Sequence, residues 1–432
     1  MYSIIERRGA LIALIRNKMK KIRLGMFGAR RGSDFYDIIK SNMGELVAVC
    51  EKDSEKCKQA KDFWGENLAV YDNFDDFIKH DMDAVFLCNY FHEHAPYAIR
   101  CIEKGIPVLS ECTAAGTIAE AVELVRAVEK HKTIYMLSEN YAYMLFNQEM
   151  RKIYRKGELG TLLYAEGEYN HPANKLDQNP AQTTKMLTPY LEHWRNHLPR
   201  TYYITHSLAP LMWITGARPV KVTAMPVYKP EISSGIYNGD LGAAMLITND
   251  DNSVFRVFGH ASFGFREDSY RVVGTKGQIE NIRGGGGKVA LNFNPWDIPE
   301  GKQENNVYMP EWVSECGDLD MEVLKRSGHG GSDYFTIYEF FNCIRENRQH
   351  EIDVYFAASM SVVGILAFRS ILENKPFDIP NMKDESERSK FENDRETPFY
   401  SSDGGKPTIR CCSDPNFVQK KEVIDRYLDI VK

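Results

Sequence analysis

The chain has 432 residues, of which 43% are hydrophobic, and its formal net charge at neutral pH is -6. This length exceeds one ordinary domain, so we expect two domains. The negative charge, with no basic stripe to offset it, argues against a nucleic-acid partner. No window of about 18 apolar residues suggests a membrane span. The nine cysteines are an odd number and several fall in apparent core segments, which indicates reduced thiols in a cytoplasmic protein.

Residues 1–20 form an extension before the first expected strand. They are basic and partly apolar, but they lack the clean apolar core and small-residue cleavage site of a signal peptide. We expect an extra helix that packs on the protein or on a partner subunit. A disordered extension and a membrane-surface helix are the alternatives.

Residues 21–140 alternate apolar runs with helical segments. The runs predict strands at 22–28, 46–51, 83–89, 106–111 and 133–137. Strands that alternate with helices imply a parallel, doubly wound sheet, whose ligand crevice lies at the carboxyl ends of its strands. We therefore expect an α/β dinucleotide-binding domain of the Rossmann type over residues 21–140.

Residues 141–432 follow a different pattern and form the second expected domain. Consecutive strands without intervening helices favour an open, largely antiparallel sheet in an α+β domain. The expected strands lie at 162–169, 220–228, 243–247, 254–260, 270–273, 278–281 and 289–292. Helices near 334–345 and 357–372 would cover this sheet. The charged, turn-rich segment 383–406 is expected to be an exposed excursion, before a terminal helix from about 416 to 431.

A glycine turn lies where the first strand gives way to a helix. Gly28 and Gly32 would let the backbone approach a pyrophosphate, which a helix N-terminus attracts. Arg30 stands where a GxGxxG motif has its second glycine, so an ordinary strand-to-helix turn is the alternative.

Glu51 ends the second expected strand, 23 residues after Gly28. An acid at this place accepts hydrogen bonds from the adenosine ribose hydroxyls and repels a 2′-phosphate, which favours NAD over NADP. NADP remains the alternative because three cations lie near the turn, namely Arg30, Arg31 and Lys52.

The chain resembles the Gfo/Idh/MocA oxidoreductases over nearly its whole length. The matching segments are 25–32, 49–51, 89–96, 105–111 and 274–277. The resemblance implies a Rossmann domain, a second domain with an open sheet, and hydride transfer between a nicotinamide and a sugar or cyclitol. Many members are oligomers that pack through that sheet, so we expect a homo-oligomer. The residues expected to bind NAD are Gly28, Arg30, Arg31, Gly32, Glu51, Asn89, His94, Glu111, Cys112 and Asn140.

The family's usual Glu-Lys-Pro motif is altered here to Glu111, Cys112 and Thr113. The family lysine assists removal of the substrate hydroxyl proton, and a thiol supplies no fixed positive charge. Cys112 is interpreted as a small side chain packed beside the nicotinamide. The chemistry then uses another acid/base group, or the protein has lost redox activity.

Candidate acid/base and sugar-binding groups occur in the second expected domain. His206 opens an apparent helix and is the predicted base, with Tyr203 and Tyr169 orienting the substrate hydroxyl. A helix cap or a buried hydrogen-bonding histidine is the alternative reading of His206. Trp194 and Arg195, in a polar-aromatic loop with His193 and His197, are the predicted sugar binders.

These residues resemble a lysine-lacking branch of the family that includes NAD-dependent α-N-acetylgalactosaminidases. The matching residues are Tyr203 with His206, the pair Glu139–Asn140, Tyr169, and the segment 328–333. The resemblance adds Glu139 and His329 to the predicted substrate-binding residues, which also include His171 because it ends the same expected strand as Tyr169. Members of this branch oxidise the sugar transiently and eliminate the aglycone, whereas related enzymes stop at the 3-oxo-glycoside.

Three functions therefore remain open. The leading one is NAD-dependent oxidation of a sugar ring hydroxyl, at position 3 of a glycoside, and the second is net glycoside hydrolysis through transient oxidation. The third is a non-catalytic nucleotide-binding sensor or assembly subunit. A metal held by His171 and His206 with a carboxylate is a further alternative, but no ligand spacing demands it and we expect none.

Overall fold

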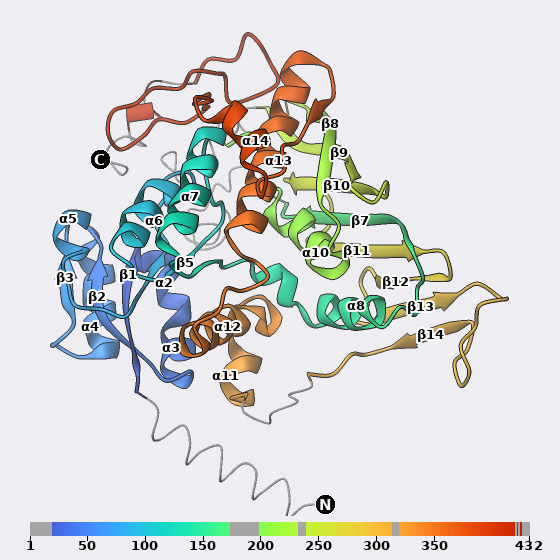
Figure 1. Ribbon diagram of the computed structural model, residues 1–432, viewed down its shortest axis with the longest axis horizontal. Helices are drawn as coiled ribbons and strands as arrows, with labels where there is room; N and C mark the ends of the chain where they lie inside the picture. The colour runs from blue at the N-terminus through green and yellow to red at the C-terminus, as the bar shows by residue number, and fades with distance from the viewer. Residues whose placement is uncertain are drawn as a thin grey trace, which may run out of the picture.

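The computed structural model describes residues 20–172, 198–231, 239–312 and 319–419, together with Lys421, Ile424 and Asp425. Two sheets organise these residues and lie side by side, with helices around and between them (Figure 1). The expectations for residues 1–19 and for the loop containing Trp194 and Arg195 fall outside the described residues. Residues 416–419 are not helical, whereas Lys421, Ile424 and Asp425 are, so the terminal helix begins later than predicted.

The first sheet has six parallel strands in the order β3-β2-β1-β4-β5-β6. Its strands are β1 (Ile22–Phe27), β2 (Gly44–Cys50), β3 (Ala69–Tyr71), β4 (Ala84–Leu87), β5 (Val108–Ser110) and β6 (Tyr135–Leu137). The order reverses between β1 and β4, which is where doubly wound sheets bind their ligands. The prediction of a parallel α/β domain is confirmed. The short, half-buried β3 was not foreseen.

Helices flank both faces of this sheet (Figure 1). They are α2 (Ala29–Gly32), η1 (Ser33–Phe35), α3 (Tyr36–Ser41), α4 (Ser54–Trp64), α5 (Phe74–Phe77), α6 (His94–Glu103) and α7 (Ile118–His131). Local sequence explains where α7 begins, because Thr117 and Glu120 form a reciprocal capping box that satisfies backbone N–H groups of its first turn.

The second sheet has nine strands in the order β14-β13-β12-β11-β7-β10-β9-β8-β15. Its strands are β7 (Leu162–Asn170), β8 (Pro219–Tyr228), β9 (Asp240–Asn249), β10 (Val254–Ala261), β11 (Glu267–Gly274), β12 (Gly277–Asn281), β13 (Val289–Phe293), β14 (Asn305–Tyr308) and β15 (Phe377–Asp378). Only β7 and β10 pair in parallel, so the predicted, largely antiparallel sheet is confirmed.

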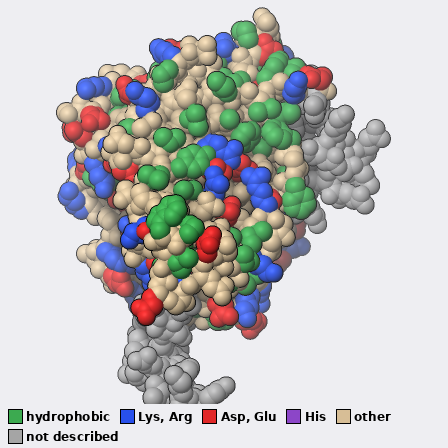
Figure 2. Space-filling model, turned by 90° about the vertical axis from the view of Figure 1, so that its right-hand side faces the viewer, with side chains coloured by type: hydrophobic (Ala, Val, Ile, Leu, Met, Phe, Trp, Pro, Cys, Tyr) green, Lys and Arg blue, Asp and Glu red, His purple; other side chains and the backbone are tan. Residues whose placement is uncertain are grey.

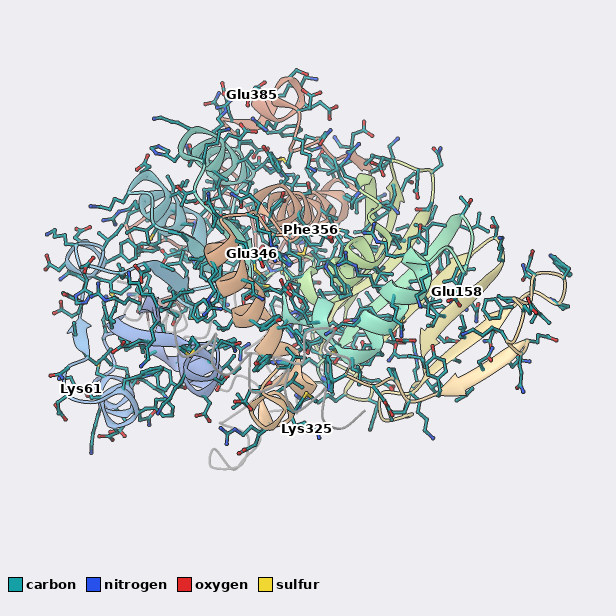
Figure 3. The ribbon with its side chains drawn as sticks, turned by 60° about the horizontal axis from the view of Figure 1, so that its bottom comes forward. Lys61, Glu158, Lys325, Glu346, Phe356 and Glu385 are labelled. Carbon is teal, nitrogen blue, oxygen red and sulfur yellow. The ribbon has the colours of Figure 1, made fainter. Side chains whose placement is uncertain are left out.

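Helices pack on the inner face of this sheet and connect it to the first. They are η2 (Asn140–Tyr143), α8 (Leu145–Arg155), α10 (Thr205–Thr215), α11 (Met321–Arg326), η4 (His329–Gly331), α12 (Ser332–Glu346) and α13 (Val354–Glu373). α10 lies so close to β7 that a Cβ on Gly167 would meet the Ser207 carbonyl oxygen at 2.0 Å. In Figure 3, Glu346 on α12 and Phe356 on α13 lie between Lys61, at one end of the molecule, and Glu158, at the other.

α13 is the one described helix that is long and apolar enough to cross a membrane. Most of it is buried inside the protein, where it contacts both α7 and β8. It therefore has the surroundings of a core helix, and its central part is apolar on all sides because both sheets' layers cover it.

The segment 383–406 differs from the expectation of an exposed excursion. It lies over α6 and α7 (Figure 1), starting with α14 (Glu385–Arg388) and η5 (Ser389–Phe391). Phe399 is 2% exposed and stacks on His92 at 4.4 Å between ring centroids. Arg388 pairs with Glu129 of α7. The charges that suggested solvent exposure are thus partly used to attach the segment to the Rossmann domain.

Candidate active site

The candidate site lies at the carboxyl ends of β5 and β6. Cys112 and Glu139 each follow one of these strands by two residues, so they emerge at the same edge of the first sheet. α10 brings His206 to this edge from the second domain. The predicted nucleotide half and the predicted acid/base group therefore meet at one place.

Glu139, His206 and Tyr203 form a hydrogen-bonded chain. His206 Nδ1 lies 2.8 Å from Glu139 Oε1, and His206 Nε2 lies 2.9 Å from the Tyr203 hydroxyl. An ionised carboxylate only accepts hydrogen bonds, so Nδ1 carries the hydrogen, and when the ring is neutral Nε2 accepts the hydrogen of the Tyr203 hydroxyl. The structure thus gives Glu139, predicted to bind substrate, the position of a partner that orients the histidine.

Glu139 is fully buried and accepts two further hydrogen bonds, from the Tyr141 N–H and the Cys112 thiol, both at 3.1 Å. Burial alone would raise its pKa, but the charge of His206 and these hydrogen bonds outweigh burial and lower it. For Cys112, burial and the nearby acids Glu139 and Glu111 raise the thiol pKa well above its usual range. Cys112 is therefore a neutral donor to Glu139 and no substitute for a lysine.

Aromatic rings enclose the imidazole of His206. Tyr141 stacks on it with ring centroids 3.9 Å apart, and Tyr169 meets it edge-on at 4.9 Å. Tyr169 also packs against Tyr203 at 5.6 Å. The structure thus brings together the three residues predicted to be catalytic. Sequence reasoning missed Tyr141, although its place directly after the Glu139–Asn140 pair was a usable signal.

Tyr169 has histidines on its other side, at the end of β7. His260 stacks on its ring at 5.6 Å, and His171 lies at 5.6 Å. His260 Nδ1 lies 2.9 Å from a guanidinium nitrogen of the buried Arg200. His171 is therefore near the site, and its role in binding substrate stays a prediction. Within the described ranges, no group of three or more His, Cys, Asp or Glu side chains is arranged to hold a metal ion.

Arg31 joins the two domains through Asp333. Its guanidinium makes a two-bond contact with Asp333 at 2.9 and 3.1 Å and donates to Glu111 at 3.0 Å. Burial would raise the Asp333 pKa, but Arg31 and His329 hold it well below its usual range. Asn140 donates to Asp333 at 2.7 Å, and His329 Nδ1 lies 3.1 Å from it. Arg31 is thus committed to this cluster rather than placed to meet a 2′-phosphate.

The backbone at the glycine turn fits a dinucleotide. Gly28 has a φ of 96°, and a Cβ there would meet the Cys88 carbonyl oxygen at 2.5 Å. Gly32 has a different reason, since a Cβ there would meet the Met26 sulfur at 2.1 Å, so it allows the helix to pack on β1. Arg30, also predicted to bind cofactor, is exposed at this turn.

Glu51 is held at the same turn by backbone N–H groups. Its carboxylate accepts from Ala29 at 2.8 Å, Lys52 at 2.8 Å and Asp53 at 3.0 Å. These bonds fix an acid at the end of β2, which is the place where dinucleotide folds bind the adenosine ribose.

Asn89 and Asn140 provide further groups for a cofactor at the carboxyl edge. Both amide atoms of Asn89 and the Oδ1 of Asn140 are buried without a hydrogen-bond partner among the described residues. Buried amides normally bond, so these atoms mark a place for a polar ligand. His94 is buried, which lowers its pKa to about 4, and its Nδ1 lies 2.8 Å from the Thr113 carbonyl oxygen. His94 is therefore neutral and fixes the segment that follows Cys112.

Two family models match separate parts of the chain. Residues 22–139 match the oxidoreductase family with an NAD-binding Rossmann fold, and residues 214–387 match the glycosyl hydrolase 109 C-terminal domain. Curated relatives include glycosyl hydrolase family 109 proteins of Shewanella sp. strain W3-18-1 and of Shewanella pealeana. They are 25% and 23% identical over 406 residues, covering 84% of this chain and 85% of each relative.

Solved structures share the fold at low sequence identity. Levoglucosan dehydrogenase in complex with NADH and levoglucosan is 17% identical, with a TM-score of 0.70 over 84% of this chain and 100% of that one. Myo-inositol 2-dehydrogenase from Lactobacillus plantarum is 18% identical, with a TM-score of 0.61 over 83% of this chain and 100% of that one. The chain thus joins a domain that matches the oxidoreductase family with an NAD-binding Rossmann fold to one that matches the glycosyl hydrolase 109 C-terminal domain.

Proposed function

We propose that this NAD-dependent oxidoreductase oxidises a ring hydroxyl of a sugar, at position 3 of a glycoside. The observation that carries the proposal is the buried chain Glu139–His206–Tyr203 at the carboxyl edge of the NAD-binding sheet. It supplies a proton acceptor where the family lysine is replaced by Cys112. The dehydrogenases that share the fold, whose titles name levoglucosan and myo-inositol, support a sugar-like substrate.

The proton of the substrate hydroxyl leaves through Tyr203 and His206. As the Tyr203 oxygen accepts that proton, its own hydrogen passes to His206 Nε2 over the 2.9 Å contact. Glu139 holds Nδ1–H and stabilises the imidazolium that forms, because its carboxylate is ionised and fully buried. His206 is therefore the final proton acceptor, and Tyr203 is the group that faces the substrate.

The residues that would hold NAD are Gly28, Glu51, Asn89 and Asn140, whose geometry fits it as described above. When bound, NAD supplies the nicotinamide that accepts the hydride from the alcohol carbon. The rings of Tyr141 and Tyr169 exclude water around the imidazole and offer apolar faces to the C–H surface of a sugar. Trp194 and Arg195 remain predicted sugar binders.

The direct test is to incubate the protein with NAD and a panel of glucosides, galactosides and inositols. Mass spectrometry should find a keto-sugar two hydrogens lighter than its substrate. His206→Ala should abolish that product while leaving NAD binding intact. If NAD binds but no member of the panel yields a keto-sugar, the oxidation is excluded for those classes and the sensor function gains support.

Net glycoside cleavage is the second candidate, because the curated relatives are named glycosyl hydrolase family 109 proteins. In that case the sugar is oxidised, the aglycone is eliminated, and the sugar is reduced again. Free aglycone with no net reduction of NAD supports cleavage. Stoichiometric reduced NAD together with a persistent keto-glycoside supports oxidation alone.

A second copy of the chain is the partner we propose for the outer face of the nine-stranded sheet. Leu163, Met225 and Leu246 are 52%, 72% and 53% exposed there. Figure 2 shows apolar side chains gathered among charged ones on the side of the molecule that faces the viewer. Light scattering should give a mass of at least two chains, and Leu246→Glu should lower it. A monomer at high concentration would contradict this partner.

A further inference from the structure

Asp268 faces the pocket from the second sheet. On β11 it lies directly across from Tyr169 on β7, and residues opposite each other in an antiparallel pair point to the same side. Tyr169 and Tyr270 on that inner side are only 3% and 1% exposed. The Asp268 carboxylate therefore points into the space beside the Tyr169 ring, which lies 4.9 Å from His206.

The surroundings of Asp268 disfavour its charged form. No side chain or N–H group of the described chain donates a hydrogen bond to its carboxylate. Burial is the largest influence and raises the pKa of Asp268 to about 7, with a small further rise from Glu267. His329 and Arg266 oppose this rise without cancelling it.

Aromatic side chains lie near Asp268. Tyr141 and Tyr270 are near enough for the Asp268 charge to raise their phenol pKa values further, in addition to the larger effect of burial. Tyr141 also lies close to two histidines, since its ring centroid is 3.9 Å from that of His206 and 5.6 Å from that of His329. Asp268 and the Tyr203–His206 pair are therefore both near Tyr141.

Oxidation of a hydroxyl requires only one proton acceptor, and the Tyr203–His206 pair provides it. A second carboxyl group that exchanges its proton near neutral pH is useful when a second bond breaks and the leaving atom needs a proton. In a glycoside, C2 is the neighbour of the oxidised C3. The next carbon, C1, carries the bond to the oxygen of the aglycone. Asp268 lies beside Tyr169, whose ring packs against the groups that act on C3.

We propose that Asp268 is a further catalytic residue, which protonates the oxygen that leaves C1, so that the chain cleaves glycosides after oxidising them. This inference rests on the proposed oxidation and selects cleavage as its outcome.

The proposed elimination balances in its atoms and electrons. The C3 carbonyl formed with NAD as the oxidant acidifies the C2–H bond, and the first proton has been released to water. The Tyr203–His206 pair takes the C2 proton, the C2–H electron pair forms the C1=C2 double bond, and the C1–O bond breaks with its electrons on oxygen. Asp268 gives that oxygen its proton. Water then adds to C1 and gives its proton to Asp268, the Tyr203–His206 pair returns the proton it took to C2, and the C3 carbonyl would take back the hydride together with a proton from water.

The test compares the NAD-loaded protein with Asp268→Asn on leaving groups of different basicity. Methyl glycosides need a proton on the leaving oxygen, whereas 4-nitrophenyl glycosides do not. We expect release from methyl glycosides to fall about 100-fold or more, and release of nitrophenol to fall less than about tenfold. Exchange of C2–H for deuterium in heavy water should persist, because the base is intact. Glu280→Gln, on β12 of the same sheet with its side chain beside Gln278, is the control and should change neither rate.

The pH dependence gives a second readout. Release from methyl glycosides by the unaltered protein should decline as pH rises through about 7, where Asp268 loses its proton. That limb should be absent from Asp268→Asn. Equal losses on both leaving groups, or unaltered release from methyl glycosides, would overturn the role of Asp268. A keto-glycoside with no aglycone from any substrate would overturn it too, while leaving the oxidation standing. Failure to form any keto-sugar would remove the oxidation on which it rests.

Discussion

Glu139 and Asp268 are two carboxylates of one candidate site, and their environments shift their pKa values in opposite directions. Glu139 is the more deeply buried, yet its pKa is lowered, because His206, Tyr141 and Cys112 all provide hydrogen bonds. Asp268 is less buried, and burial, which no described donor offsets, raises its pKa to about 7. The balance between burial and the partners of each acid therefore leaves Glu139 ionised at neutral pH and lets Asp268 gain and lose its proton there.

The pKa of each acid limits the role that it can have. An ionised acid with every oxygen bonded can fix a histidine and stabilise its positive form, but it has no proton to give. A neutral acid without donors can give one. Substitutions that remove these acids or their partners should therefore change the rate or the stability, and the largest effect is expected at Glu139.

Replacing Glu139 by Gln removes the ionised side of the comparison. The amide keeps a similar shape but supplies no charge for the imidazolium, so we expect the oxidation rate to fall about 10³-fold or more. Steady-state kinetics measures this, and calorimetric NAD binding shows that the fold is intact. Glu158→Gln, at the turn between α8 and β7 where its carboxylate faces Lys302, is the control. A loss of less than about tenfold in Glu139→Gln would show that His206 acts without a counter-charge.

Asp333 is a third carboxylate, and it is charged because Arg31 lowers its pKa. Asp333→Asn leaves Arg31 buried with only Glu111 and the more exposed Asp34. Breaking such a pair on one side costs about 3–5 kcal/mol in the free energy of unfolding, measured by urea denaturation. Arg31→Met combined with Asp333→Asn should recover part of this loss. Additive losses in the double variant would mean that the two side chains are not coupled.

Glu51 tests the charge of an acid held only by backbone groups. Glu51→Ser removes the repulsion of a 2′-phosphate and the ribose hydrogen bond, so NAD should bind more weakly and the gap to NADP should narrow by roughly tenfold. Calorimetric titration of both cofactors into the stripped protein decides it. Arg31 is held by Asp333, so only Arg30 or Lys52 is placed to gain a contact with the phosphate. Tighter binding of NADP by the unaltered chain would contradict this role of Glu51.

Cys112 gives the smallest expected effect. Cys112→Ala removes one of the hydrogen bonds to Glu139, so that fewer donors stabilise the charged form of this carboxylate. A lost thiol donor should cost about 1 kcal/mol or less, seen as a small drop in the unfolding midpoint and in rate. Cys112→Ser keeps a donor and should lie nearer the unaltered protein. A complete loss of activity in Cys112→Ala would assign the thiol a direct part in the chemistry.

The sequence predicted the elements that local pattern determines. Apolar runs such as Ala84–Leu87 are buried along their whole length, and the prediction of a parallel sheet followed from their alternation with helices. The three half-buried residues of β3 carry no such pattern, which is why this strand was missed. The segment 383–406 has the composition of a solvated loop, and only its long-range contacts with α7 and His92 show that it packs on the Rossmann domain.

The site was predictable where motif and chemistry coincide. His206, Tyr203 and Tyr169 are together, as the missing lysine and the resemblance suggested. The partners that set their charge were not, because they come from distant parts of the chain: Arg31 meets Asp333 across 302 positions, and Glu139 meets His206 across 67. Asp268 carries no motif, and only its register with Tyr169 places it at the pocket.

The central claim is that Glu139, His206 and Tyr203 move a proton during oxidation of a sugar hydroxyl. A single-turnover experiment tests it most directly, because it detects oxidation whether or not the sugar is reduced again. The NAD-loaded protein is mixed with excess glycoside, and reduced nicotinamide is followed by absorbance. We predict a rise in the unaltered protein that His206→Ala abolishes and that slows when C3 carries deuterium. An NAD-loaded protein that shows no rise with any glycoside, or an unchanged rise in His206→Ala, would contradict the account.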